Sequence, residues 1–200
     1  MLLFLARHGE TVAQGVFYGH DDVALSPTGR AQMERLAAHL QRHALAAVYS
    51  SDLQRARDGA ELVAAPRGLA VRVDPRLREM CLGCLEGLAY GAAAARHPEL
   101  AGRDYASMAE FRMPGGGESM ADVWQRVQPA LAELGARHPG ERVAVVTHNS
   151  VARLILGDAL GLPLAGVFGF AQEYGCLNVI DYRRGRPVVL LLNGRPGAPG

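Results

Sequence analysis

Six short apolar runs alternate with longer amphipathic segments along this chain of 200 residues, and this alternation constrains the fold more than any other feature. The runs lie at residues 2–6, 46–49, 69–73, 143–147, 177–182 and 188–192. Parallel strands need crossovers of about a dozen residues, usually helical, so strands separated by helices predict a mostly parallel central sheet with helices on both faces. We therefore expect a three-layer α/β fold.

Capping signals mark two of the helices between these runs. Ser26 followed by Pro27 fits the N-cap and first position of a helix reaching about residue 40. Ser119 with Asp122 three residues later fits the start of a helix to about residue 138, and we expect Pro129 to kink that helix. The other long helices are predicted at residues 51–65, with Ser51 or Asp52 at the start, and 148–161.

The chain is interpreted as one domain over residues 1–193. Residues 79–117 are less regular and glycine-rich toward their end, so we expect an excursion over one edge of the sheet, with short helices at 90–97 and 104–112. Residues 194–200 have no apolar periodicity and are predicted to be a disordered tail.

Charge and hydropathy exclude several classes of partner. The formal net charge is +1 with both signs scattered along the chain, so we expect neither a nucleic acid nor an anionic membrane surface as a partner. The apolar runs fall short of the roughly 20 residues of a spanning helix, and Arg7 and His8 interrupt the first run before it could act as a secretion signal. A cytoplasmic location is the default expectation. The oligomeric state stays open, with a homo-oligomer allowed.

Three cysteines, an odd number in a chain without a predicted signal peptide, favour reduced thiols over a disulfide framework. Cys81 and Cys84 form the motif CLGC. A zinc site would need a second pair or nearby histidines, and only Cys176 remains, so metal or redox use is the minor alternative.

Polar groups converge where the strands are predicted to end. Arg7 and His8 directly follow the first run, His148 follows the run 143–147, and Arg55 lies in the first turns of the helix after the second run. Ligand sites of such folds lie outside the carboxyl ends of the strands, so these four groups should face one crevice. Glu79 could reach the same rim after a short turn.

Two arginines and two histidines at helix N-termini suit a compact dianion such as a phosphate group. No carboxylate cluster is present, so neither a metal nor another cofactor is implied. A neutral histidine can attack phosphorus and form a phosphohistidine, guanidinium groups stabilise the charge of the transferring group, and a carboxylic acid can protonate the leaving alkoxide. Glu79 is the candidate acid.

Each of these residues taken alone would fit a structural or surface role, and only their joint placement favours catalysis. The remaining histidines lie in loop or helical contexts and are interpreted as surface residues, with His20 able to line the mouth of the site; they are His20, His39, His43, His97 and His138. The segment PGGGES lacks the lysine of a phosphate-binding loop and is interpreted as a turn.

At these residues the chain resembles the histidine phosphatase superfamily, the phosphoglycerate-mutase-like group with RHGE signatures. The segments that carry the resemblance follow in order from Leu2 to about Ser150: ARHGET, ALSPTGRAQ, SSDLQRA, LREMCLGCLEG, PGGGES and VVTHNS. The resemblance implies a phosphoglycerate-mutase-like fold, His8 as the phosphorylated nucleophile, Arg7, Arg55 and His148 as the phosphate pocket, and Glu79 as the proton donor.

Departures from the family pattern bear on substrate fit, among them Gly59 in the helix that carries Arg55 and Leu85 before the segment EG. Gln14 stands where the family often has asparagine, and Asn149 where a glycine is common. We expect Gln14, Asn149 and Thr11 of the nucleophile motif to contribute to substrate binding.

Three functions remain open at this point. The short chain and the segment GCLEG resemble the phosphatase pattern, so metal-independent hydrolysis of a small phosphorylated metabolite through a phosphohistidine is the first hypothesis. A cofactor-dependent phosphoglycerate mutase is the second. A non-catalytic phospho-ligand-binding protein is the third, although intact His8 and Glu79 argue against it.

Overall fold

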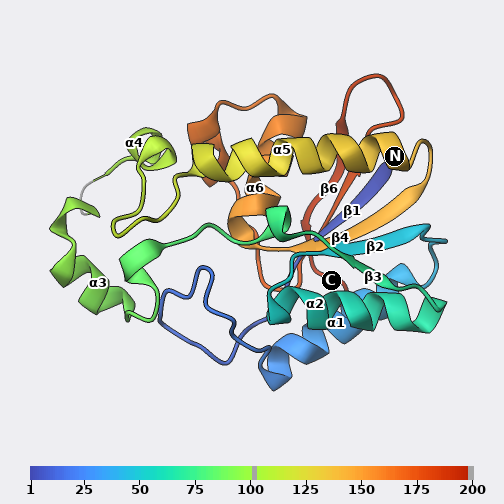
Figure 1. Ribbon diagram of the computed structural model, residues 1–200. Helices are drawn as coiled ribbons and strands as arrows, with labels where there is room; N and C mark the ends of the chain where they lie inside the picture. Colours follow the sequence, from blue (N-terminus) through green and yellow to red (C-terminus); the bar gives the residue numbers. More distant parts are fainter. Residues whose placement is uncertain (101–102, 198–200) are drawn as a thin grey trace.

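The computed structural model describes residues 1–100 and 103–197 (Figure 1). The described residues form one sheet of six strands: β1 (Leu2–Arg7), β2 (Ala47–Ser50), β3 (Val71–Val73), β4 (Arg142–Thr147), β5 (Leu177–Asp181) and β6 (Val188–Gly194). The α-helices of the described residues are α1 (Pro27–Leu40), α2 (Gln54–Ala64), α3 (Tyr90–Arg96), α4 (Tyr105–Glu110), α5 (Met120–Arg137) and α6 (Asn149–Leu160).

The strand order is β3-β2-β4-β1-β5-β6, which puts the first strand of the chain in the interior of the sheet. Strands β3, β2, β4 and β1 pair in parallel, whereas β5 runs antiparallel to both β1 and β6. The expected mostly parallel α/β architecture is confirmed, with an antiparallel hairpin added at one edge.

Alternating side chains of the central strands divide the core between the two faces of the sheet. Leu3 and Leu5 pack with α5 and α6, while Phe4 and Ala6 pack with α1 and α2. Successive side chains of a strand point to opposite faces, so a strand buried on both faces needs an unbroken apolar run. Figure 1 shows the resulting layers, with α1 and α2 on one side of the sheet and α5 and α6 on the other.

Both predicted N-caps are confirmed. The Ser26 hydroxyl accepts the Gly29 amide at 3.0 Å, with Pro27 in the first turn of α1. Ser119 and Asp122 form a reciprocal capping box at the start of α5, which runs continuously through Pro129. The expected start of α2 at Ser51 or Asp52 is wrong, because the Ser51 hydroxyl bonds His148 and the helix begins only at Gln54.

The excursion, defined as residues 79–117, contains the two expected short helices α3 and α4. The sequence-based interpretation starts the disordered tail too early in the chain. Gly194 is the last residue of β6, and the Arg195 guanidinium lies 3.5 Å from the Glu173 carboxylate. Residues 198–200 of that tail lie outside the described residues. His138, expected at the surface, is instead buried, where Nε2 lies 2.9 Å from the Tyr49 hydroxyl.

No helix in the described part of the chain is long and apolar enough to cross a membrane.

Candidate active site

The two histidines predicted to share a crevice lie side by side at the carboxyl ends of β1 and β4. The parallel register pairs Arg7 with Thr147, and the His8 amide donates to the Thr147 carbonyl at 2.9 Å. The imidazole centroids of His8 and His148 are 5.1 Å apart. Both side chains are buried, with exposed fractions of 1% and 0%.

Two arginines place positive charge against these rings. Arg7 Nη1 donates to the Gln172 carbonyl at 2.6 Å. Arg55, whose exposed fraction is 0%, donates from Nη1 and Nη2 to the carbonyls of Asp21 and Gly19 at 2.8 and 2.6 Å. Each guanidinium is therefore tied by one edge to a loop. We call Arg7, His8, Arg55 and His148 the strand-end site.

Two glycines allow the loop after β1 to pack closely against the first turn of α1. A Cβ on Gly9 would lie 2.2 Å from the Gly29 carbonyl oxygen, and one on Gly29 would lie 1.9 Å from the Glu10 carbonyl oxygen. Real Cβ atoms cannot approach backbone so closely. The loop after His8 therefore packs directly on the first turn of α1, which locks the backbone that carries the imidazole.

Burial sets the protonation state of both histidines. It lowers the pKa of His8 well below 6.5, and the positive charges of Arg7 and Arg55 lower that pKa further. The pKa of His148 is also well below 6.5, first through burial and then through Arg55. His8 Nδ1 lies 2.7 Å from the Gly9 carbonyl, which can only accept, so Nδ1 carries the hydrogen and Nε2 keeps a free lone pair.

Glu79 reaches the site from the start of the excursion. Its carboxylate oxygen Oε1 accepts the Ser150 amide at 3.2 Å, in the first turn of the helix that follows His148. Its negative charge acts on Arg55. The structure therefore brings together all five residues predicted to be catalytic.

A second network holds the backbone of Glu79. Arg126 on α5 donates to the carbonyls of Arg76, Arg78 and Glu79 at 2.7 to 2.8 Å and pairs with Glu118 at 2.8 Å. His20 Nε2 also lies 2.8 Å from the Glu79 carbonyl, so His20 adjoins the site rather than the bulk surface.

The other predicted substrate-binding side chains are engaged elsewhere. Thr11 is buried and its hydroxyl donates to the Ala13 carbonyl at 3.1 Å. The amide of Gln14 turns back to the Thr11 carbonyl at 2.7 Å. Asn149 Oδ1 accepts from Arg153 at 3.0 Å. A role of these three side chains in substrate binding therefore stays a prediction.

Sequence patterns missed three residues at the site. The Ser51 hydroxyl lies 2.7 Å from His148 Nε2 and fixes that ring. Tyr174 stacks on Arg7, with the guanidinium carbon 3.8 Å from the ring centroid, and Tyr18 lies 4.8 Å from the Arg55 guanidinium carbon. Both tyrosines come from loops without periodicity, so no sequence signal placed them; Ser51 could have been found from its position at the carboxyl end of β2.

The strand-end site contains buried nitrogens that lack a hydrogen-bond partner. Among the described residues these are Arg7 Nε, Arg55 Nε and His148 Nδ1, alongside two atoms elsewhere, Arg67 Nη2 and Tyr182 Oη. Unpaired buried polar groups cost about 1–3 kcal/mol each, and a ligand that pairs them recovers that cost. Guanidinium groups can only donate, so the arrangement suits a ligand rich in acceptor oxygens.

The metal alternative rests on the motif that holds Cys81 and Cys84. Cys84 Sγ lies 3.5 Å from His97 Nε2. Within residues 1–100 and 103–197, no three His, Cys, Asp or Glu side chains gather in a group that could hold a metal ion.

Comparison with known proteins gives one family across nearly the whole chain. The model of the histidine phosphatase superfamily (branch 1) matches residues 3–195. Two curated proteins of Arabidopsis thaliana align with 76% of the chain. Phosphoglycerate mutase-like protein 4 is 41% identical over 155 residues, and the metal-independent phosphoserine phosphatase is 38% identical over 160 residues. The alignments cover 67% and 66% of these relatives, so the chain spans about two thirds of their length.

A solved structure extends the similarity to the full fold. The mycobacterial glucosyl-3-phosphoglycerate phosphatase, in a complex with VO3, superposes with a TM-score of 0.86 at 31% identity. The superposition covers 96% of this chain and 98% of the other.

Proposed function

Because the chain belongs to the histidine phosphatase superfamily and its relatives include named phosphatases, it is a phosphomonoester hydrolase, and we propose that it hydrolyses a small phosphorylated metabolite through a phosphohistidine at His8, without a metal ion. The observation that carries the proposal is the set of three unpartnered buried nitrogens of Arg7, Arg55 and His148 around a neutral imidazole. A phosphate group supplies acceptor oxygens for all three.

In the first step, the free lone pair of His8 Nε2 attacks phosphorus. The bond from Nε2 to phosphorus forms as the bond to the ester oxygen breaks. Arg7, Arg55 and His148 donate to the nonbridging oxygens and stabilise the charge spread over them in the transition state. Glu79 in its protonated form transfers its proton to the leaving oxygen.

In the second step, the carboxylate of Glu79 takes a proton from water. The resulting hydroxyl oxygen bonds to phosphorus while the bond to His8 Nε2 breaks, which regenerates the imidazole and releases inorganic phosphate. The Ser150 amide at 3.2 Å holds the carboxylate at the helix N-terminus during both transfers.

The charges of the site and the names of the relatives together support a small substrate and a reaction that needs no metal ion. Two guanidinium groups supply the positive charge that phosphoryl transfer otherwise takes from a metal ion. One plant relative is named a metal-independent phosphoserine phosphatase, and the mycobacterial neighbour acts on glucosyl-3-phosphoglycerate by its name. The partner in this proposal is a small phosphomonoester in the cytoplasm, with neither nucleic acid nor membrane surface involved.

The test is release of inorganic phosphate from a panel of phosphomonoesters with a chelator present, with His8→Ala assayed alongside. We expect release that needs His8 and survives the chelator. Wild-type protein quenched in alkaline detergent after reaction with a ³²P-labelled ester should carry a phosphoryl group that is stable to base, is lost in acid and is missing from His8→Ala.

Three results would overturn parts of this proposal. Activity lost to the chelator and restored by added metal would contradict metal independence. Conversion of 3-phosphoglycerate to 2-phosphoglycerate without phosphate release would make the protein a mutase. If no ester of the panel reacted at all, a binding protein would be favoured.

A further inference from the structure

A pair of tyrosines bridges the outer side of the strand-end site. The hydroxyls of Tyr18 and Tyr174 are 2.9 Å apart and share a hydrogen bond, although the residues are 156 positions apart in the sequence. Tyr174 stacks on Arg7 at 3.8 Å, and its ring centroid lies 5.7 Å from that of His8. Tyr18 lies over Arg55 at 4.8 Å. The bridge therefore joins the two guanidinium groups of the phosphate pocket.

Each loop that supplies a tyrosine also holds the arginine beneath it. The Gln172 carbonyl, two residues before Tyr174, accepts from Arg7, and the Gly19 carbonyl, next to Tyr18, accepts from Arg55. The two tyrosines are half-buried, whereas His8 and Arg55 beneath them are 1% and 0% exposed. The tyrosines thus lie between the phosphate pocket and solvent.

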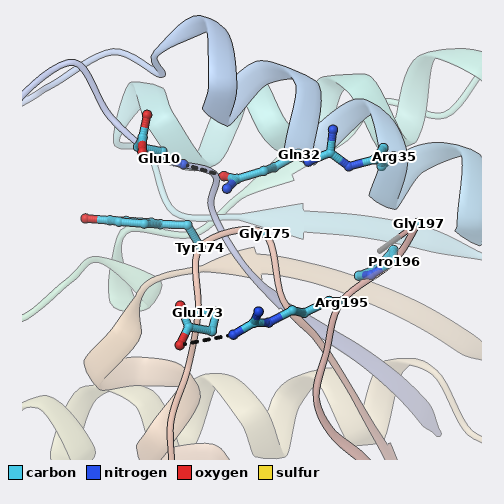
Figure 2. Close-up of a pocket in the computed structure, with 9 residues that line it drawn as sticks. All are labelled: Glu10, Gln32, Arg35, Glu173, Tyr174, Gly175, Arg195, Pro196 and Gly197. Carbon is cyan, nitrogen blue, oxygen red and sulfur yellow. Dashed lines mark hydrogen bonds and ion pairs between the residues drawn. The ribbon is translucent and has the colours of Figure 1, made fainter. Parts of the chain in front are cut away.

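A substrate cannot contact a His8 side chain that is 1% exposed unless some covering group moves. Tyr174 has space to do so, because it also lines a cavity of about 550 Å³ on its other side. Figure 2 shows Tyr174 at one end of this cavity, with its ring pointing away from Arg35, Pro196 and Gly197.

We infer, on the basis of the proposed function, that Tyr18 and Tyr174 select the leaving group: their hydroxyls separate when an ester binds and then hydrogen-bond a hydroxyl-bearing leaving group. Separation breaks a shared hydrogen bond and leaves two phenol groups to be paired. A polyol leaving group pairs them, whereas an alkyl group of the same size leaves both unsatisfied in a desolvated site. The preferred substrates are phosphomonoesters of polyhydroxy compounds.

The Tyr174 phenol stays a protonated donor at neutral pH. Burial and the neighbouring Tyr18 hydroxyl raise the pKa of Tyr174 far above its ordinary value. A neutral phenol can donate to and accept from a substrate hydroxyl, which an ionised phenolate could not do.

The experiment compares glycerol 1-phosphate with propyl phosphate, which differ by two hydroxyl groups. We expect the wild-type protein to favour glycerol 1-phosphate in kcat/KM by about 10- to 100-fold, because propyl phosphate leaves two desolvated phenol groups without a hydrogen-bond partner. The double variant Tyr18→Phe, Tyr174→Phe keeps both rings but removes both hydroxyls. It should reduce the preference to within about threefold.

Two controls separate leaving-group selection from damage to the fold. Tyr182→Phe makes the same change at a buried hydroxyl remote from the strand-end site and should keep the wild-type preference. Inhibition by inorganic phosphate reports on the anion pocket alone, and its inhibition constant should stay within about twofold in the double variant, because the rings over both arginines are retained.

The outcomes are distinct. An unchanged preference in the double variant, or no preference in the wild type, would overturn the role of the tyrosines while leaving the hydrolase intact. Loss of phosphate inhibition in the double variant would assign the hydroxyls to the anion pocket and equally overturn it. If the wild type released phosphate from no ester, the proposed function itself would fail.

Discussion

The strand-end site and the excursion over residues 79–117 hold their functional groups by different means. Arg7, His8 and His148 follow directly from strands in the interior of the sheet, so buried backbone pairing places them. Glu79 instead depends on side-chain hydrogen bonds from α5, chiefly those of Arg126. The comparison teaches that Arg7, His8 and His148 are set by the sheet, whereas the proton donor is set by a polar network that can change without disturbing them.

The largest expected effect comes from the nucleophile. His8→Ala should lower the rate of phosphate release by at least about 10⁴-fold, because no other group replaces the covalent step. The measurement is steady-state phosphate release with a matched His97→Ala variant, which removes an imidazole from the excursion. If both variants lost activity equally, the loss could not be assigned to the covalent step at His8 in the strand-end site.

Next in size is the proton donor. Glu79→Gln should lower kcat/KM for an alkyl phosphate by about 10²- to 10⁴-fold, since a poor leaving group needs a proton. With p-nitrophenyl phosphate, whose leaving group needs none, we expect a burst of p-nitrophenol followed by slow turnover. Rapid-mixing absorbance measurements check this, and the exposed Glu110→Gln is the control. Equal losses for both esters would remove Glu79 from the role of acid.

A smaller effect should follow from removal of the hydrogen bonds that hold the backbone of Glu79. Arg126→Gln removes hydrogen bonds to three carbonyls and the pair with Glu118. We expect kcat to fall about tenfold and the free energy of unfolding to fall by about 2–3 kcal/mol, as hydrogen bonds from a charged group suggest. Urea denaturation and phosphate-release assays measure both.

Arg112→Gln is the matched control for that variant. Its pair with Asp122 involves a side chain that is 62% exposed, so the change in stability should stay below about 0.5 kcal/mol. Inhibition by inorganic phosphate should be unaffected in both variants, and a lost inhibition in Arg126→Gln would show that the network also sets the strand-end site.

The last expected effect is on stability alone and appears as a dependence on pH. The pKa values of His8 and His148 are lowered on folding, so the unfolded chain binds more protons below about pH 6.5. The free energy of unfolding should therefore fall as the pH drops below 6.5, by at most about 1.4 kcal/mol per pH unit for each histidine. Urea denaturation at several pH values should show a shallower slope for a double variant, His8→Asn with His148→Gln. An unchanged slope would contradict the lowered pKa values.

The extent to which the sequence predicts each region follows from this difference between placement by strand pairing and placement by side-chain hydrogen bonds. His8 and His148 could be placed because an apolar run that stops at an imidazole marks the end of a buried strand, and parallel strands end at one edge. The start of α2 was misplaced because Ser51 bonds a residue 97 positions away, which no local pattern encodes. His138 was misjudged for the same reason, since its partner Tyr49 is 89 positions distant.

The hydrogen-bond partners of individual side chains are harder to predict than their place in the fold. Gln14 and Asn149 were assigned to the substrate by position in a motif, yet their amides bond Thr11 and Arg153. The orientation of such side chains depends on which nearby backbone groups still need partners, and that is decided only after the chain has folded. Tyr18 and Tyr174 meet across the site by the same kind of long-range contact.

The position of β1 within the sheet has a consequence for the order of folding. Leu2 pairs with Arg142 on one side and with Asp181 on the other, so both neighbours of β1 in the sheet lie far from it along the chain. Contacts between residues so far apart form slowly, because the intervening chain must be ordered first. The nucleophile therefore reaches its working position only late in folding, after the segments between β1 and its two neighbours have been ordered.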